Sequence, residues 1–297
     1  MNLINHTPSL VAFVRTVESG SFSAAARTAN MTPSAVSKGI GRLEVELGAK
    51  LFRRSTRHLS LTPEGQAFFE RVAPLLRGIE DSADAVRPAG DARGVLKVSM
   101  PSEIGRLLMA PITTRFLARN EHLELDLSLS DRHADVIREG YDLVFRVGVA
   151  QDSDLISRTL AQLDMALVAS PAFLARYGEP TTLEQLRGMP FVRYLFRSRA
   201  LPVRFEDGTS IQPRGRIGMD TGAGLRAAAL EGMGVAHLMK CRVQADLEQG
   251  YLIQVLPQLR LPSLPLQSMH AFGRLTPARV RLFTDFVARE MQRIVAG

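Results

Sequence analysis

Apolar residues recur at helical spacing in three successive segments at the start of the chain. Gly20 follows the first segment and Gly48 follows the third, and glycine is the usual residue after a helix C-terminus. Ser21 and Thr32 can accept the first free N–H groups of a helix, so the second and third helices are expected to begin there, the third with Pro33 at its first position. The three apolar stripes consist of Leu10, Phe13, Val14 and Val17; of Phe22, Ala25, Ala26 and Ala29; and of Ala35, Val36, Ile40, Leu43 and Leu47.

The opposite face of the third helix carries short or cationic residues, which suit entry into a DNA major groove. Two short apolar segments then flank a cationic turn at 51–62, a pattern typical of a β-wing whose arginines reach phosphates or a minor groove. Residues 1–60 hold eight basic and three acidic residues, a net charge of +5 in a chain of net charge +7. The alternative is a small helical bundle with a solvated basic face. The exposed residues of the third helix are Ser34, Ser37, Lys38, Gly39, Gly41 and Arg42, and those of the wing are Arg53, Arg54 and Arg57.

A long helix is predicted over 64–87, ending before Pro88 and Gly90, and Pro74 is expected to kink it. Its apolar positions form a coiled-coil-like seam. The seam either is buried within its own domain or, since so short an N-terminal domain offers little core, pairs with a second copy and forms a homodimer. The seam consists of Phe69, Val72, Leu76, Ile79, Ala83 and Val86.

Strands and helices alternate after the linker at 91–94, which predicts a parallel doubly wound sheet. The first set comprises strands at 95–100, 123–129 and 141–147 and helices at 104–118 and 133–139. A second set implies a second lobe, and its elements are expected at 165–169, 171–177, 182–186, 191–196, 222–232 and 241–249. A last amphipathic helix is expected at 278–295.

Composition narrows the class of protein. The chain has 297 residues, of which 45% are hydrophobic, as in ordinary soluble proteins. It lacks an apolar run long enough for a membrane span and a secretory signal, so a cytoplasmic location and no membrane partner are expected. The single cysteine, Cys241, is expected to be a small buried residue, and the histidines show no zinc spacing. No phosphate loop or nucleophile elbow is present, so we expect no metal, no cofactor and no enzymatic activity.

Several motifs in the first 65 residues resemble the LysR-type transcriptional regulators. They are Gly20-Ser21-Phe22-Ser23-Ala24-Ala25-Ala26; Ser37 to Gly48 with Ile40, Leu43, Glu44 and Leu47; Leu51-Phe52-Arg53-Arg54; and Leu61-Thr62-Pro63-Glu64-Gly65. The resemblance also covers the rest of the chain. It places Pro33, Ser34, Ser37, Lys38 and Arg42 on the recognition helix, and Arg54 and Arg57 on a wing along the minor groove. Pro33 stands where glutamine is common, so base contacts at that point are apolar or shift to neighbouring residues.

The resemblance implies an α/β protein with a winged helix-turn-helix at 1–62, a dimerisation helix at 63–90 and an effector-binding domain at 91–297. This last domain resembles a bilobal periplasmic-binding-protein fold, with lobe I at 91–163 and 268–297 and lobe II at 164–267. The implied partners are operator DNA, a small-molecule effector, further copies of the chain as a dimer or tetramer, and RNA polymerase.

Four residues are candidate effector contacts. Ser102 lies at a strand-to-helix turn, where a helix N-terminus favours an anion or a carbonyl oxygen, and a simple N-cap is the alternative. Arg146 ends a segment that resembles the family's Asp-Leu-Ala-Ile-Arg-x-Gly, and either an acidic ligand or a structural ion pair is its partner. Thr221 lies at a similar turn in lobe II. Tyr194 is either an aromatic wall or part of the core, and His237 is expected to be structural.

Two other classes of function stay open. A solute-binding or catalytic bilobal protein with an accessory helical module would bind ligand or turn over substrate without salt-sensitive DNA affinity. A non-specific architectural DNA binder would ignore the DNA sequence and need no effector.

Overall fold

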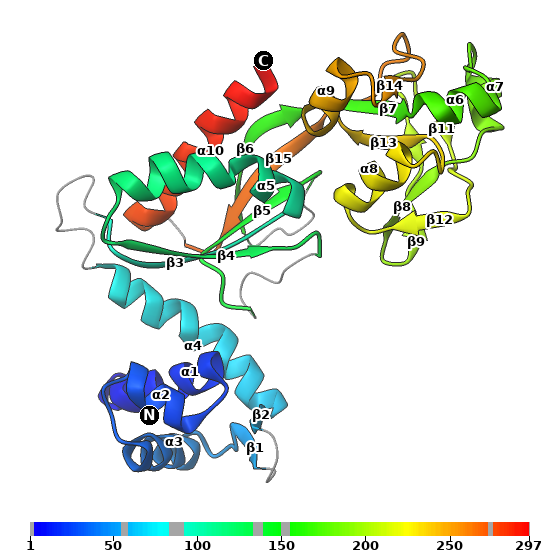
Figure 1. Ribbon diagram of the computed structural model, residues 1–297. Coiled ribbons are helices and arrows are strands. Elements are labelled where there is room, and N and C mark those ends of the chain that lie inside the picture. Colours follow the sequence, from blue (N-terminus) through cyan, green and yellow to red (C-terminus); the bar gives the residue numbers. More distant parts are fainter. Residues whose placement is uncertain are drawn as a thin grey trace. The chain divides into compact units, whose positions relative to one another are not determined.

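The computed structural model describes residues 3–54, 59–82, 92–132, 139–149, 155–272 and 276–296. The chain divides into two compact units, one formed mainly by residues 1–89 and the other mainly by residues from 90 onward (Figure 1). In these described ranges, no helix combines the length and apolarity needed to cross a bilayer.

The first unit has three short helices, a two-stranded hairpin and a long helix. The caps expected from sequence are confirmed: Ser21 Oγ accepts from the N–H of Ala24 at 3.1 Å, and Thr32 Oγ1 accepts from the N–H of Ala35 at 3.2 Å. Gly20 and Gly48 adopt left-handed backbone angles at the ends of the first and third helices, with φ of 69° and 64°. The elements are α1 (Thr7–Ser19), α2 (Phe22–Thr28), α3 (Pro33–Leu47), β1 (Phe52–Arg54), β2 (Leu59–Leu61) and α4 (Pro63–Ser82), preceded by a 3-10 turn at Leu3–His6.

Phe13 is the centre of the first unit's core. Its ring lies 5.5 Å from the rings of Phe52 and Phe68 and 6.4 Å from that of Phe69, centroid to centroid. These neighbours come from the hairpin and from α4, so residues distant in sequence close the core over α1. The long helix α4 is therefore part of this unit and not only a connection beyond it.

The seam predicted on α4 divides into two parts. Phe69 and Val72 are buried in the unit's own core, which corrects the prediction that the whole seam contacts a partner. The core of three short helices is too small to close without them. Beyond Pro74, through which α4 continues, Leu76 is half-buried against the same core, whereas Ile79 is 65% exposed. Leu75, which is not part of the predicted seam, is 68% exposed beside it. The seam positions at 83 and 86 lie outside the described residues.

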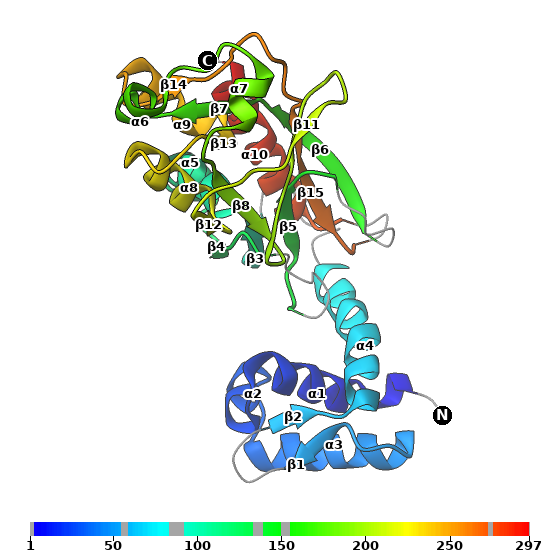
Figure 2. The ribbon, with the colours of Figure 1, turned by 90° about the vertical axis from the view of Figure 1, so that its right-hand side faces the viewer.

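Lobe I of the second unit is a five-stranded sheet in the order β4-β3-β5-β15-β6 (Figure 2). The parallel arrangement predicted for the first three strands is confirmed, since β3 pairs in parallel with β4 and β5. The other two strands were not predicted, and β15 runs antiparallel to both β5 and β6. The bounds are β3 (Gly94–Met100), β4 (Leu123–Leu129), β5 (Leu143–Val147), β6 (Ile156–Leu163) and β15 (Leu264–His270).

Two helices complete lobe I. Helix α5 (Ser102–Pro111) begins two residues earlier than predicted and continues as a π turn and then a 3-10 turn to Arg119. Helix α10 (Ala278–Ala296) returns to this lobe as predicted, and its Phe283 ring lies 4.9 Å from that of Phe116. The helix predicted at 133–139 falls almost entirely outside the described residues.

The return of the chain to lobe I comes earlier than predicted. The boundary expected at residue 268 falls inside β15, whose seven residues all pair with β6. A strand paired along its whole length belongs to one sheet, so lobe I resumes at Leu264.

Within the described residues, lobe II contains three small sheets instead of a single parallel one, and the smallest is the antiparallel pair β10-β11. In the first, β7 lies between the antiparallel strands β13 and β14; in the second, β8 pairs in parallel with β12 and in an antiparallel hairpin with β9. Short strands with mixed directions carry little periodicity, which is why several were not predicted. The strands are β7 (Met165–Ala169), β8 (Val192–Phe196), β9 (Arg199–Ala200), β10 (Val203–Arg204), β11 (Ser210–Ile211), β12 (Ile217–Met219), β13 (Ala236–Met239) and β14 (Ile253–Gln254). The helices are α6 (Pro171–Tyr177), α7 (Leu183–Arg187), α8 (Gly222–Leu230) and α9 (Lys240–Glu248).

Candidate DNA interface and effector site

Helix α3 presents the predicted polar face to solvent. Pro33, Ser34, Lys38 and Arg42 are exposed, and Ser37 is half-buried. Two cations and two hydroxyl groups on one helical face can contact phosphates and base edges without removing a bulky apolar side chain from the protein core. The surface therefore has the chemistry of a recognition helix.

Gly39 is an exception to that face. The sequence grouped it with the groove-facing residues, but it is buried and faces α1. A Cβ atom at this position would lie 3.3 Å from Ser9 Oγ. Gly39 thus allows α1 and α3 to approach closely, and it is not available to DNA.

The hairpin of β1 and β2 forms the predicted wing. Phe52 pairs with Leu61, and Phe52 is buried, which anchors the wing on the core. Arg53 is exposed on β1. The side chain of Arg54 and the whole of Arg57 lie outside the described residues, so their placement on the wing stays a prediction.

Glu44 holds the start of the wing against α3, a role the sequence reasoning did not assign to it. Its carboxylate is buried and accepts from Lys50 Nζ at 2.6 Å and from the N–H groups of Leu51 and Phe52 at 2.9 and 3.4 Å. Burial alone would raise the pKa of Glu44, but these hydrogen bonds outweigh it and hold the pKa below the ordinary value. The available signal was its position in the sequence motif from Ser37 to Gly48, of which Glu44 is a member.

A cavity of about 510 Å³ opens in the first unit, between the end of α1, the wing and the start of α4. Arg53 lines it, together with Thr16, Phe52 and Gln66. None of the four predicted effector residues takes part.

At the predicted effector site, the protein itself supplies the anion expected at the start of α5. The backbone N–H of Ser102 donates to Asp131 Oδ1 at 2.8 Å. Ser102 is the first residue of α5 and Pro101 precedes it as the cap, so the N-cap alternative for Ser102 is wrong. Burial, together with the nearby carboxylates of Glu103 and Asp220, raises the pKa of Asp131 despite this hydrogen bond.

Lobe II contributes Thr221 and Tyr194 to the same region. Thr221 caps α8, and its Oγ1 accepts from the N–H of Gly224 at 3.3 Å. Tyr194 on β8 is half-buried, and burial, followed by the charges of Asp131 and Asp220, raises its pKa to about 12. Its hydroxyl is therefore a neutral hydrogen-bond donor. Ser102 and Tyr194 are thus both linked to Asp131, the first by a hydrogen bond and the second by its charge, and Thr221 directly follows Asp220 in the chain.

An ion pair joins the two lobes beside this group. Glu103 Oε2 on α5 accepts from Arg242 Nε on α9 at 2.5 Å, and Glu103 is 3% exposed. The Cγ of Glu103 lies 3.0 Å from the position that a Cβ on Gly222 would occupy at the start of α8. Sequence reasoning missed this pair because its partners are 139 positions apart.

The sequence also singles out Arg146, His237 and Cys241. Arg146 lies on β5 opposite Gln267 and is half-buried. Burial lowers the pKa of His237 to about 4, so this histidine is neutral at pH 7, as a structural residue would be. Cys241 is half-buried and not fully buried as expected, and burial raises the pKa of its thiol.

Two family profiles match nearly the whole chain. The profile described as bacterial regulatory helix-turn-helix protein, lysR family, matches residues 8–66, and the LysR substrate binding domain matches residues 89–292. The chain belongs to the LysR-type transcriptional regulators. The resemblance, the fold class and the regulatory function expected from sequence are thereby confirmed.

Individual relatives extend over the same length. The regulator is 31% identical to the HTH-type transcriptional regulator CrgA of Neisseria meningitidis, over 98% of this chain and 99% of that protein. It is also 31% identical to the uncharacterized HTH-type transcriptional regulator YhjC of Escherichia coli, over 94% of this chain and 96% of that protein. The solved CrgA structure matches 95% of this chain and 98% of its own with a TM-score of 0.62. The structure of ArgP from Mycobacterium tuberculosis, 23% identical, matches 95% of this chain and 96% of its own with a TM-score of 0.68 and supports the fold alone.

Proposed function

We propose that this regulator reads an operator through α3 and the wing and that an effector held between its two lobes controls it. The proposed DNA contacts are Pro33, Ser34, Ser37, Lys38, Arg42, Arg53, Arg54 and Arg57. The proposed effector contacts are Ser102, Arg146, Thr221 and Tyr194. The observation that carries the DNA part is the exposed polar face of α3, which Gly39 and the caps fix against the core.

We propose the division of the chain into a DNA-binding domain at 1–62, a dimerisation helix at 63–90 and an effector domain from 91 onward. The exposed Leu75 and Ile79 on α4 support dimerisation, since two large apolar side chains on one helix favour burial against a second copy. A dimer presents two α3 helices to two half-sites. Association of dimers into tetramers and contact with RNA polymerase stay predictions.

The effector site favours a ligand that donates hydrogen bonds. Asp131 already occupies the N–H of Ser102, and Asp220 and Glu103 add negative charge around it. A ligand carboxylate placed there would be repelled, whereas an amine or hydroxyl group would be attracted. Tyr194 and Thr221 can bind its acceptor atoms. We propose that the chain regulates transcription without catalysing a reaction and that it acts in the cytoplasm.

Electrophoretic mobility shifts and footprints on the intergenic DNA beside the regulator's own gene test the DNA part. We expect a footprint that a scrambled sequence abolishes. Lys38→Ala and Arg42→Ala should each weaken binding, by about 1 to 3 kcal/mol where the side chain contacts a base. Arg71→Ala, an exposed cation on α4, is the matched control and should bind as the wild type does. Equal footprints for all these proteins would refute the assigned reading face.

A further inference from the structure

Lobe II carries a second basic segment, in addition to the one at residues 1–60. Residues 193–216 contain six arginines and two acidic residues, and none of the basic residues is a lysine. The net charge of this segment is +4, close to that of the whole DNA-binding module. The arginines are Arg193, Arg197, Arg199, Arg204, Arg214 and Arg216.

The fold brings these arginines onto adjoining strands. Arg193 on β8 lies opposite Gly218 of β12, two residues after Arg216. The N–H of Phe191, just before β8, donates to the carbonyl oxygen of Arg214 at 2.7 Å. On the other side of β8, Arg199 pairs with Phe196 in the hairpin. The six arginines therefore lie on the sheet β12-β8-β9 and its connections, and the three strands of this sheet lie together in lobe II (Figure 1).

Most of these arginines are exposed to solvent. Arg193 is half-buried and the other five arginines are exposed. Arg193 Nε donates to the carbonyl oxygen of Ile217 at 3.4 Å, and the Arg197 guanidinium lies over the Phe196 ring at 5.4 Å. Within the ranges that the structure describes, none of the six forms an ion pair with a carboxylate.

The clustering of arginines without a carboxylate partner distinguishes this surface within the second unit. Elsewhere in the unit some arginines pair with acidic residues, for example Arg115 with Glu290 at 2.6 Å and Arg158 with Asp285 at 2.6 Å. Other exposed arginines, such as Arg106 and Arg289, lie on separate helices. The two acidic residues within the segment do not neutralise it. Asp207 accepts from the N–H and the hydroxyl group of Thr209 in the turn between β10 and β11, and Glu206 is exposed.

We propose that this arginine surface of lobe II binds backbone phosphates of duplex DNA, as a second contact in addition to α3 and the wing. The inference rests on the proposed function, since a regulator held at an operator brings its other surfaces near the same polyanion. A planar guanidinium binds phosphate oxygens through two parallel hydrogen bonds, and this favours arginine over lysine at such contacts. Contacts of this kind carry no sequence information but add affinity that depends on salt.

The test compares two triple variants of the full-length regulator on a duplex of about six helical turns with the footprinted operator at its centre. Arg199→Gln, Arg204→Gln and Arg216→Gln together remove three exposed charges from the arginine surface. Arg106→Gln, Arg119→Gln and Arg289→Gln together remove three exposed charges elsewhere in the second unit. The logarithm of the binding constant is measured against the logarithm of salt concentration.

We expect the first triple variant to reduce the steepness of this salt dependence by about 0.9 for each phosphate that it no longer neutralises, and up to about 2.7 for three phosphates. The second triple variant should match the wild type. Replacement of the same three residues by lysine should retain most of the salt dependence, which separates the removal of charge from damage to the fold.

An unchanged salt dependence in the first triple variant would overturn the proposal. The result would instead favour an acidic protein as the partner of this surface. Equal reductions in both triple variants would also overturn it, because they would reflect net charge alone. A wild-type regulator that binds no duplex would instead refute the proposed function, which is a separate result.

Discussion

Single residues fix the local structure of the DNA-binding unit, and some of them are visible in the sequence. Ser21 and Thr32 are followed by helical patterns, so their capping roles could be predicted from neighbours a few positions away. Glu44 and Gly65 act through more distant contacts. A Cβ on Gly65 would lie 2.1 Å from the carbonyl oxygen of Leu51, so only glycine allows α4 to start against the wing. Such requirements appear only when the chain is folded.

At this scale we predict that Glu44→Gln destabilises the DNA-binding unit by about 1.5 to 3 kcal/mol at pH 7. An amide replaces a buried carboxylate that accepts three hydrogen bonds, one of them from a cation. Urea unfolding followed by circular dichroism measures the change.

The lowered pKa of Glu44 also predicts how this difference depends on pH. A carboxyl group whose pKa is lower in the folded state stabilises that state above its unfolded pKa and loses this contribution as pH falls through the folded value. The difference between Glu44→Gln and wild type should therefore shrink in acid. Glu46→Gln, an exposed neighbour, is the control and should have little effect. A constant difference from pH 7 to acid would contradict the assigned role.

At the scale of elements, α4 shows how one periodic pattern can serve two purposes. The spacing of its apolar residues predicts a helix with a buried stripe, and the helix is present. The pattern does not determine which residues pack against each part of the stripe. Phe69 and Val72 pack on Phe13 and its neighbours, whereas Leu75 and Ile79 extend past that core.

We predict that Leu75→Ser with Ile79→Ser weakens the proposed dimer by tenfold or more. Burying each of these side chains contributes about 1.5 to 3 kcal/mol, and the serine side chain does not replace it. Sedimentation equilibrium on the full-length regulator measures the dissociation constant. Glu64→Ser with Arg71→Ser changes exposed polar positions of the same helix and should leave the constant unchanged. A dimer of unaltered affinity in the first variant would place the interface elsewhere.

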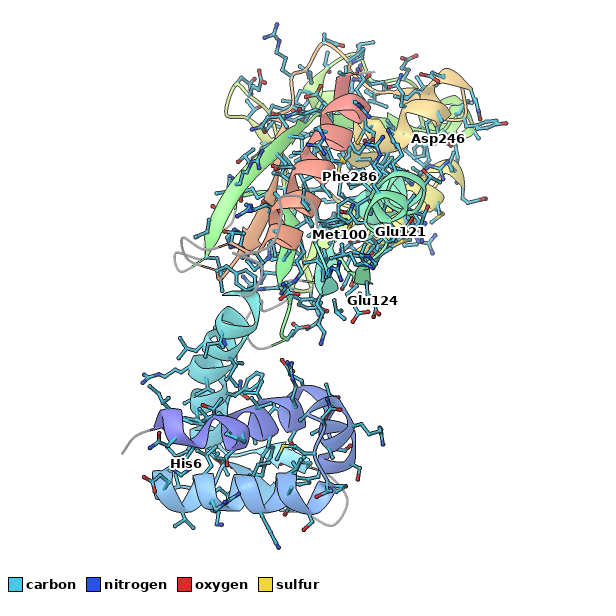
Figure 3. All side chains as sticks on the ribbon, turned by 90° about the vertical axis from the view of Figure 1, so that its left-hand side faces the viewer. His6, Met100, Glu121, Glu124, Asp246 and Phe286 are labelled. Carbon is cyan, nitrogen blue, oxygen red and sulfur yellow. The ribbon has the colours of Figure 1, made fainter. Side chains whose placement is uncertain are left out.

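At the scale of the whole molecule, ion pairs between distant segments connect parts of the effector domain. Arg242 binds Glu103 across the two lobes, whereas Arg226 binds Asp246 within lobe II. Figure 3 labels Asp246. Both acidic partners are buried. A buried charge that loses its partner is costly, so each pair constrains the elements that carry it.

We predict that Arg242→Gln lowers the unfolding free energy of the effector domain by about 3 to 5 kcal/mol, since it leaves Glu103 buried and uncompensated. The double variant Glu103→Gln with Arg242→Gln should recover much of this loss. Hydrogen exchange should increase at the start of α5, which carries Glu103, in Arg242→Gln. In Arg226→Gln, which breaks a pair between α8 and α9 within one lobe, exchange at the start of α5 should not change. Equal exchange there in both single variants would exclude a special role for the pair between the lobes.

The sequence by itself determined the helices and caps of the DNA-binding unit, the strands β3, β4 and β7, and the family. These features depend on periodicity and on contacts a few residues apart, which a linear pattern contains. The tertiary structure decided the contacts of the α4 seam, the addition of β6 and β15 to the sheet, the position of Asp131 at Ser102 and the arginine surface of lobe II. These depend on which distant segments meet, and the free energy of that choice comes from burial and charge pairing over the whole fold.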